Sequence, residues 1–428
     1  PVLNERTPSM LKTHSYQTSV DSALTMTLIA LLGSTLYSYL QRGAWAGLPD
    51  AFDFRVYYTA SKVIIEGHTE HLYDTDWFYS VHVQPYQYFP FLAIILAPLS
   101  LLPFVKAAAV WMVINQLILA GSIWVTIKGL VNRDVRIILG IIILFLGFGP
   151  MDANMYWGQV NAVIMLCILL AWWAYKQDKP WLCGFMIALG TFIKIVPAIL
   201  GVYFLYKQAY KVVWTGFISG VGLLLFSIII LGGFSEHVAW FTDMLPFLTG
   251  DGGMGKGGGV LNQSFLAMYI RMAQNGLFPE SYAPDLHLIS ELIIMILSFA
   301  LCRFERLTPK SPEFDLEFAA VSCLTVLMPQ VTGSANYVYV FPAFIILLVY
   351  IVNNSLYSIP VFVCYGAAYT LVSLGAFGSG FFARFPLSLI QSSKLIGVLI
   401  VWTILGYLSL RLRGIFGNVE INKQKPLD

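Results

Sequence analysis

Apolar runs of roughly the length needed to cross a bilayer recur from residue 23 to residue 410, with only short polar segments between most of them. A spanning helix needs about 20 mostly apolar residues. The chain is 58% hydrophobic and only 11% charged, and its mean hydropathy is +0.73, whereas soluble domains are about 25% charged. We therefore expect one all-α, polytopic membrane domain over residues 1–428 and no separate soluble domain. The net charge of +2 indicates no particular partner.

Lysines and arginines in the short loops predict the path of the chain, because these residues collect on the cytoplasmic side of a membrane. The basic clusters lie at 6–12, 128–136, 176–179, 207–211, 303–310 and 411–425. Placing all of them inside gives about twelve crossings, with both ends in the cytoplasm. The expected spans are 23–40, 107–127, 137–149, 160–174, a hairpin of two short helices within 181–206, 212–231, 288–301, 316–328, 338–351, 359–371 and 395–410. The residues before the first span have no apolar core, so we expect no cleaved signal peptide.

Three segments are expected on the exterior face: a catalytic loop with juxtamembrane helices at 43–104, a lid-like loop at 232–287, and a shorter segment at 374–394. Within the first, the run 88–102 extends roughly 22 Å at 1.5 Å per residue, which is less than the bilayer core of about 30 Å. We expect it to dip into the membrane or lie on its surface. The stretch that begins at Asp53 places Phe54, Tyr57 and Tyr58 at helical spacing. This predicts an amphipathic helix that lies flat on the outer leaflet.

Asp53 has two alternative roles in this helix. Its carboxylate could cap the helix by accepting a backbone N–H. It could instead act as a general base toward the hydroxyl group of an acceptor at the membrane surface. Asp50, Asp74 and Asp76 compete with Asp53 for the second role.

Lys194 interrupts the apolar run 181–206 in the sequence Lys-Ile-Val-Pro. An ammonium group inside the membrane costs roughly 2.5–3.5 kcal/mol on insertion scales, so such a residue is a functional candidate unless its side chain reaches the surface. A phosphate group would offset the cost of burying this cation. Arg271 and Lys256 are further cations on the exterior face. Each could be an ordinary loop charge, and the alternative for Arg271 is that it binds the same phosphate as Lys194.

Hydroxyl and amide side chains gather at helix ends on the predicted exterior face, where they suit sugar hydroxyls, which need both donors and acceptors. Residues 68, 71 and 82 are histidines without the spacing of a metal site, and the five cysteines lie in or beside apolar runs. We therefore expect neither a metal nor a disulfide. The glycine-rich run 250–257 lacks the final Ser or Thr of a phosphate-binding loop and is better interpreted as a lid. The expected substrate contacts are Tyr57, Tyr58, Tyr88, Gln159, Asn161, Asn262, Gln263, Ser264, Asn336 and Tyr337.

Five blocks in this order, DFRVYYTAS, YQYFPFLAIILAPLSLLP, YWGQVNAVIMLCILLAWW, FIKIVPAIL and LNQSFLAMYIRM, make the chain resemble glycosyltransferase family 87. The resemblance implies a GT-C fold and a polyprenyl-phosphate sugar donor, with inversion at the anomeric carbon. It also implies that Asp53 is the general base and that Lys194 lies near the donor phosphate. Members of the family often carry a histidine near the start of a late span, where this chain has Asn336 or Tyr337.

The sequence thus predicts a glycosyltransferase of the plasma (inner) membrane with an exterior active site. It would move a sugar, mannose by resemblance, from a polyprenyl phosphate to a lipid or glycan acceptor. The expected partners are membrane lipids, this donor and the acceptor, with no nucleic acid and no cofactor. The alternatives are a flippase or transporter of lipid-linked sugars, and a non-catalytic membrane assembly factor. The substitution Asp53→Asn separates these alternatives. If Asp53 is a general base, the substitution should abolish turnover but not donor binding. If the protein is a transporter, the substitution should be nearly neutral.

Overall fold

The computed structural model describes residues 7–44, 51–131, 133–249, 257–306, 308–309, 311–354, 356, 358–375, 377–378 and 380–414. Within these residues the fold is all-α, and one isolated bridge between Asn262 and Gly333 is the extent of β pairing. The helices are α1 (Thr7–Tyr39), α2 (Phe52–Ile65), α3 (Thr75–Ser80), α4 (Pro90–Ser100), α5 (Phe104–Gly129), α6 (Val135–Leu146), α7 (Gly149–Trp157), α8 (Asn161–Lys176), α9 (Pro180–Ile193), α10 (Ala198–Tyr206), α11 (Tyr210–Leu231), α12 (Ser235–Ala239), α13 (Leu245–Thr249), α14 (Phe265–Gln274), α15 (Ala283–Leu301), α16 (Pro312–Leu327), α17 (Phe341–Asn353), α18 (Ile359–Ser373) and α19 (Ser393–Leu412).

Six helices in the described chain are long and apolar enough to cross a membrane, or seven if the bent pair α6 and α7 forms one span. The axes of this pair differ by 49°. The predicted number of twelve crossings is not confirmed. Three predicted spans are helices of 10–17 residues, namely α8, α9 and α18, and at 1.5 Å per residue these fall short of the bilayer core. The helix α4, which was not expected to cross, is also in this length class.

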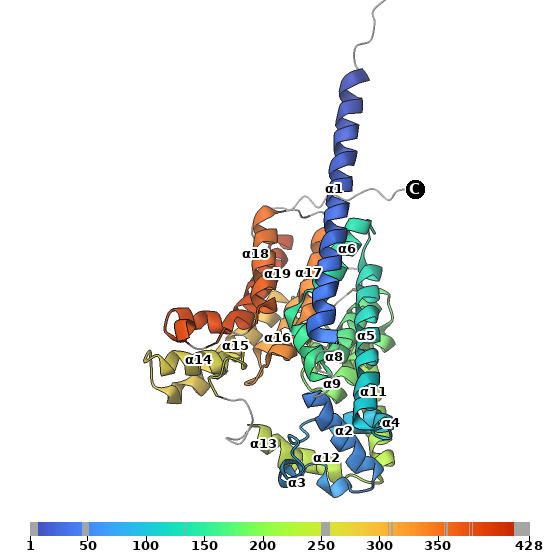
Figure 1. Cartoon of the computed structure of the whole chain (residues 1–428), viewed down its shortest axis with the longest axis vertical. Coiled ribbons are helices and arrows are strands. Elements are labelled where there is room, and N and C mark those ends of the chain that lie inside the picture. The colour runs from blue at the N-terminus through green and yellow to red at the C-terminus, as the bar shows by residue number, and fades with distance from the viewer. Residues whose placement is uncertain are drawn as a thin grey trace, which may run out of the picture.

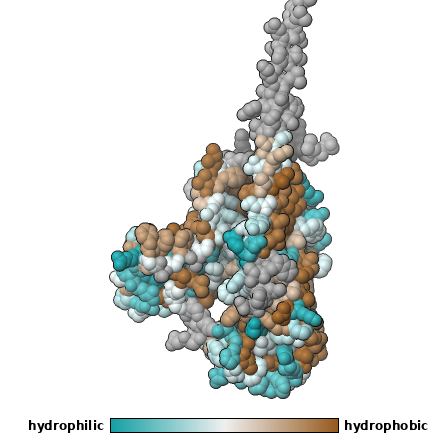
Figure 2. Space-filling view, viewed as in Figure 1, coloured by the Kyte–Doolittle hydropathy of each residue, from teal (hydrophilic) through white to brown (hydrophobic). Residues whose placement is uncertain are grey.

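The bundle has a buried centre and an apolar outside. The segment 334–353, which contains α17, is 83% buried, whereas α11 and α15 bury only 6% and 11% of their most apolar windows. Figure 2 shows hydrophobic side chains along the sides of the bundle and polar ones gathered at its lower end. A helix that is apolar on its exposed side is typical of a span that faces lipid.

Ion pairs connect several basic clusters to acids of α16 at one end of the bundle. Lys176 Nζ lies 2.7 Å from Asp315, and Lys207 Nζ lies 3.0 Å from Glu317, which also contacts Arg413 at 3.5 Å. These cations belong to three separate segments that the charge rule places on one side, and the structure confirms that they lie together. The helix α8 runs from this end to Asn161, roughly 24 Å away at 1.5 Å per residue.

Short helices cover the opposite end of the bundle. Figure 1 shows α2, α3, α12 and α13 together at the lower end of the molecule, while α1 projects beyond the upper end. The segment 43–104 was predicted to carry juxtamembrane helices, and it contains α2, α3 and α4. The segment 232–287 was predicted as a lid-like loop, and its described residues carry the helices α12, α13 and α14. Most of the glycine-rich run 250–257 lies outside the described residues.

The structure corrects three local predictions. The helix at Asp53 exists, but its apolar face packs against α4 and α5 rather than facing lipid, and Ser61 Oγ donates to the carbonyl of Ala93 at 2.8 Å. The segment GPMDANMYWGQ, expected as a loop, forms α7 because Pro150 at its first turn is compatible with a helix start. The first helix extends further toward the N-terminus than predicted, to Thr7, while its apolar part, Asp21–Arg42, agrees with the predicted span 23–40.

The predicted interruption at Lys194 is confirmed. The chain breaks between α9 and α10, because Pro197 cannot continue a helix through its missing N–H. The two helices fold back on each other, with Gly190 against Pro197 and Gly201 against Ile187. Lys194 therefore lies at the tip of a helical hairpin.

Candidate functional site

Asp53 lies in the first turn of α2, but it does not cap the helix. The capping position is Ala51, which makes no side-chain hydrogen bond. The Asp53 carboxylate instead accepts a hydrogen bond of 2.6 Å from Gln159 Nε2. Of the competing acids, Asp74 caps α3 through the Trp77 N–H at 2.9 Å, while Asp50 lies outside the described residues. Asp76 lies in the first turn of α3. Among the described acids that compete for this role, Asp53 is thus the one that accepts a hydrogen bond from the turn between α7 and α8.

Burial raises the pKa of the Asp53 carboxyl above its ordinary value, and the hydrogen bond from Gln159 and the charge of Lys194 oppose this shift. The desolvation effect is the largest of the three. A carboxylate that is partly buried yet still reachable is a stronger proton acceptor than a solvated one. Its environment is therefore suited to a general base.

The turn between α7 and α8 connects Asp53 to the rest of the site. Gly158 ends α7 in the left-handed conformation, with φ at 68°, which an L side chain rarely adopts. This turn directs Gln159 toward Asp53 and begins α8 at Asn161. Gln159 Oε1 accepts from Asn161 Nδ2, and Asn161 Nδ2 also reaches the carbonyl of Ala335 at 3.0 Å.

Lys194 completes this chain of polar contacts. Its Nζ donates to Asn161 Oδ1 at 3.2 Å and to Asn336 Oδ1 at 3.1 Å. The ammonium also lies 5.7 Å from the centre of the Tyr88 ring and 5.4 Å from that of Tyr339. Each of these contacts is with a neutral group, and the negative charge nearest in the network is Asp53. An anion that entered beside Lys194 would find a cation already held in position.

The short 3-10 helix Ser334–Val340 supplies the wall opposite α2. In such a helix, residues three apart lie on the same side, and Asn336 and Tyr339 both face Lys194. Tyr337 points elsewhere and donates to the carbonyl of Gln263 at 2.8 Å. Of the two residues that could occupy the place of the family's histidine, Asn336 is the one in contact with Lys194.

Tyrosine side chains form the remaining wall of the site. The Tyr57 hydroxyl donates to that of Tyr88 at 3.0 Å, and the two rings meet edge to face at 5.1 Å. Tyr57 is buried, whereas Asp53, Tyr88, Gln159, Lys194 and Asn336 keep part of their surface exposed. The partly exposed groups are the ones that a substrate could touch.

Other predicted contacts do not join this network. Tyr58 donates to the carbonyl of Leu102 at 2.9 Å and packs on Phe104. Arg271 is buried, and its guanidinium donates to three backbone carbonyls and to Ser392 Oγ at 2.6 Å. The described contacts of Arg271 are therefore those of a residue that holds loops together.

Asn262, Gln263 and Ser264 form a second, fully buried polar cluster. Ser264 caps α14 through the Ala267 N–H and donates to the carbonyl of Gln330 at 2.7 Å. Asn262 Oδ1 accepts from the Thr332 N–H at 3.1 Å. This cluster positions the backbone that leads to Asn336, so its connection to the site is through the 3-10 helix.

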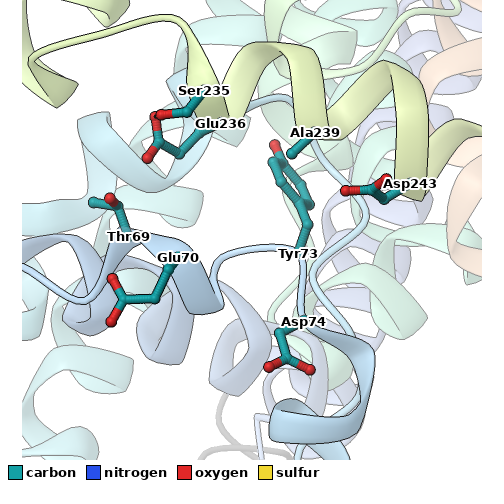
Figure 3. Close-up of a pocket in the computed structure, with 8 residues that line it drawn as sticks. All are labelled: Thr69, Glu70, Tyr73, Asp74, Ser235, Glu236, Ala239 and Asp243. Carbon is teal, nitrogen blue, oxygen red and sulfur yellow. The ribbon is translucent and has the colours of Figure 1, made fainter.

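A cavity of about 260 Å³ lies beside the site, between the loop after α2 and the helix α12 (Figure 3). Four carboxylates line it, from Glu70, Asp74, Glu236 and Asp243. Tyr73 forms part of its wall and donates to the carbonyl of Tyr88 at 2.8 Å, which connects the cavity to the site. Phosphate would be repelled here, so the cavity does not compete with Lys194 for an anion.

Tyr339 and Tyr73 are the site residues that the sequence did not reveal. Tyr339 lies three residues after Asn336, so the period of a 3-10 helix would have indicated it, but the run VYVFPAF reads as the start of an ordinary span. Tyr73 has no signal of its own, because its role depends on the folded position of the Tyr88 backbone.

The fold and this network define a polytopic membrane protein with a carboxylate and an ammonium group joined through amides at one end of its helices. The family model of glycosyltransferase family 87 matches residues 86–329, which is more than half of the chain, and the chain belongs to this family. The match includes Gln159, Asn161 and Lys194, and it begins after Asp53.

Mycobacterial mannosyltransferases are among the similar curated proteins. The chain is 31% identical over 101 residues to a polyprenol-phosphate-mannose-dependent alpha-(1-2)-phosphatidylinositol pentamannoside mannosyltransferase of Mycobacterium tuberculosis, covering 22% of this chain and 21% of the relative. The protein of the same name from Mycolicibacterium smegmatis is 31% identical over 99 residues, covering 22% of each chain. The alignments thus span about a fifth of the length of these relatives. No solved structure matches the chain.

Proposed function

We propose that this protein is a membrane glycosyltransferase that moves a sugar, mannose in the first instance, from a polyprenyl phosphate to a lipid or glycan acceptor. Membership of family 87 supports the reaction class, and the printed names of the relatives support the donor. The observation that carries the proposal is the continuous chain of contacts from the Asp53 carboxylate through Gln159 and Asn161 to the Lys194 ammonium.

In the proposed reaction, an acceptor hydroxyl oxygen attacks the anomeric carbon of the donor sugar from the side opposite the phosphate. Asp53 takes the proton of that hydroxyl as the new bond forms. The bond between the anomeric carbon and the phosphate oxygen breaks, and polyprenyl phosphate leaves with its electron pair. Lys194 stabilises the charge that collects on this phosphate. The sugar is thereby transferred with inversion.

The remaining site residues position these two groups. Gln159 holds the Asp53 carboxylate, and Asn161 and Asn336 hold the ammonium. We propose that no metal cofactor is needed, because a monophosphate leaving group carries less charge than a diphosphate and Lys194 supplies a matching cation. Arg271, whose guanidinium holds backbone carbonyls, has a structural role in this proposal.

We propose further that the site end faces the exterior of the plasma membrane, because the opposite end carries the buried basic clusters. Lysine and arginine collect on the cytoplasmic side. A transporter or flippase of lipid-linked sugars is the second candidate, since it too would use an ammonium near the membrane.

Transfer of radiolabel separates the two candidates. Purified protein is incubated with labelled polyprenyl-phosphate-mannose and a lipid extract from the source organism, and products are resolved by chromatography. The wild type should form a new labelled lipid. Asp53→Asn should lower the transfer rate roughly 10²- to 10⁴-fold, the usual contribution of a general base, while donor binding is retained. The transporter would be favoured by two results together: the wild type forms no labelled product, and Asp53→Asn flips the donor across the membrane at the wild-type rate.

A further inference from the structure

A groove of about 340 Å³ opens between α9, α10 and α11. Its lining, among the described residues, is almost wholly apolar. The helices contribute Ile187, Phe192, Leu205, Val213 and Phe217 among other residues. Two of these, Leu205 and Phe217, are more than half exposed. The groove therefore opens sideways, on the face of the bundle where α11 exposes its apolar side.

Glycines create this groove. A Cβ on Gly184 would lie 2.3 Å from Thr215 Oγ1 and 2.5 Å from the carbonyl oxygen of Val212, so its absence lets α9 and α11 approach closely. A Cβ on Gly201 would meet only Ile187 Cγ2, at 3.9 Å, and one on Gly220 would meet only Phe192, at 3.5 Å. These two positions leave open space where other residues would place a side chain.

One end of the groove begins at the candidate site. Thr191, Phe192 and Ala198 line it, and they flank the break that carries Lys194. The Phe192 ring meets the Phe89 ring edge to face at 5.5 Å. Phe89 follows Tyr88, whose ring centre lies 5.7 Å from the Lys194 ammonium. A molecule whose phosphate is held at Lys194 thus has an apolar channel available next to it.

We propose that this groove holds the first part of the prenyl tail of the lipid donor while its phosphate lies beside Lys194. The inference rests on the proposed function, because the donor is taken to be a polyprenyl phosphate sugar. An amphiphile with its anionic end at Lys194 must place its hydrocarbon away from water, and the groove is lined by Phe192 and Ala198, on either side of the break that carries Lys194. The volume, near the lower limit of small-molecule sites of about 300–1,000 Å³, fits a segment of the tail, and the remainder passes into the bilayer.

Filling the groove with a side chain tests the proposal. Gly201→Leu and Gly220→Leu each place a side chain in the open space, and Gly222→Leu is a matched control, because Gly222 lies on the same helix as Gly220 with no atom within 4 Å of its Cβ position and does not line the groove. The probe is a polyprenyl phosphate without sugar that carries a photoreactive diazirine near its phosphate, and the crosslinked peptides are mapped by mass spectrometry. Folding is checked by size-exclusion chromatography and circular dichroism.

The expected result is crosslinking to peptides of α9, α10 or α11 in the wild type and in Gly222→Leu, with at least a tenfold loss in Gly201→Leu and in Gly220→Leu. In transfer assays the two filled variants should raise the KM for a long-chain donor about tenfold and leave a single-isoprene donor unaffected. Crosslinking to other parts of the protein would overturn the inference. A phospholipid with the same diazirine serves as a second probe, and the inference would also be overturned if it labelled the groove equally and competed with the prenyl probe. The probe carries no sugar, so its binding can be measured separately from sugar transfer. Groove labelling without any transfer would contradict the proposed function but not the groove as a prenyl site. Transfer without groove labelling would contradict the prenyl site but not the proposed function.

Discussion

Asp53 experiences opposing influences at the scale of a single residue. Burial raises the pKa of its carboxyl, and Gln159 and Lys194 act in the opposite direction without overcoming it. A general base works only in its ionised form. In the proposed role of base, Asp53 would lose its activity as the pH falls through the raised pKa, which lies above the usual value for aspartate of about 4.

The pH dependence of kcat/KM for sugar transfer should therefore show an acid limb above the usual range of an aspartate. Removal of the Gln159 donor by Gln159→Leu takes away an interaction that lowers this pKa, so the limb should move to higher pH. Steady-state rates measured from pH 4 to pH 9 check this. The control is Lys62→Met, because Lys62 is an exposed lysine of the same helix that pairs with Glu66. A limb that stays in place in Gln159→Leu would remove Asp53 from the role of base.

Lys194 makes its contacts with amides and aromatic rings, so its charge is available to a phosphate. Lys194→Met should lower kcat/KM for a polyprenyl phosphate donor by roughly 10- to 100-fold, because a hydrogen bond to a charged group contributes about 1.5–3 kcal/mol. Lys194→Arg should restore part of the activity, since it keeps the charge but changes its geometry. Equal loss in Lys194→Arg and Lys194→Met, measured with folded protein, would indicate a role in packing rather than in phosphate binding.

Single residues show what the sequence could and could not predict. A carboxylate at a helix start and a lysine in an apolar run are visible exceptions to local composition, and the structure joins them in one network. Arg271 was an equally visible exception, yet its partners are carbonyls of Gly258, Gly259 and Asn262. Whether a cation faces a ligand or backbone depends on loop conformation, which no spacing rule encodes.

At the scale of elements, the turn between α7 and α8 determines where α2 sits. A Cβ at Gly158 would lie 2.8 Å from that of Phe54, and the Gly158 carbonyl accepts from Trp111 Nε1 at 2.7 Å. Phe54 also stacks on Trp111, with ring centres 5.8 Å apart. The glycine therefore permits a contact that keeps Asp53, one residue before Phe54, within reach of Gln159.

Gly158→Ala should consequently lower turnover although it removes no chemical group from the site. Gly67 is a matched control, because its φ of 77° is equally unfavourable for alanine but no atom lies within 4 Å of its Cβ position. Both changes should lower the free energy of unfolding by more than about 1 kcal/mol, as followed by thermal unfolding in detergent. Only Gly158→Ala should reduce kcat, by about tenfold or more; equal kcat in the two variants would contradict the positioning role.

The positions of several helices were easier to predict from the sequence than the number of helices that cross the membrane. The break at Lys194 and the span Phe104–Gly129 follow from proline, charge and apolar length. The number of crossings did not follow, because the charge rule assigns a side to each loop but does not measure the helix between two loops. Helices such as α9 and α18 are too short to cross the bilayer core alone, and only tertiary packing determines how they are covered.

At the scale of the whole molecule, the two ends differ in charge chemistry. One end carries the buried pair of Lys207 with Glu317 and the partly buried pair of Lys176 with Asp315. The other end carries the Asp53 network and the acidic cavity (Figure 3). Replacement of one partner in a buried pair leaves an uncompensated charge, so these ion pairs are part of the packing of the bundle. The basic end therefore cannot change sides alone, and the whole bundle has one orientation in the membrane.

Thiol labelling tests this orientation. The cysteines Cys167, Cys183, Cys302 and Cys323 are buried, and Cys364 is exposed, so Cys364→Ser provides a background with no exposed thiol among the described residues. Ser80→Cys adds an exposed thiol at the site end and Arg306→Cys adds one at the basic end. In cells with an intact plasma membrane, a membrane-impermeant maleimide should label Ser80→Cys and leave Arg306→Cys unlabelled until the membrane is permeabilised. The opposite pattern would place the Asp53 network in the cytoplasm and would require a donor whose sugar faces inward.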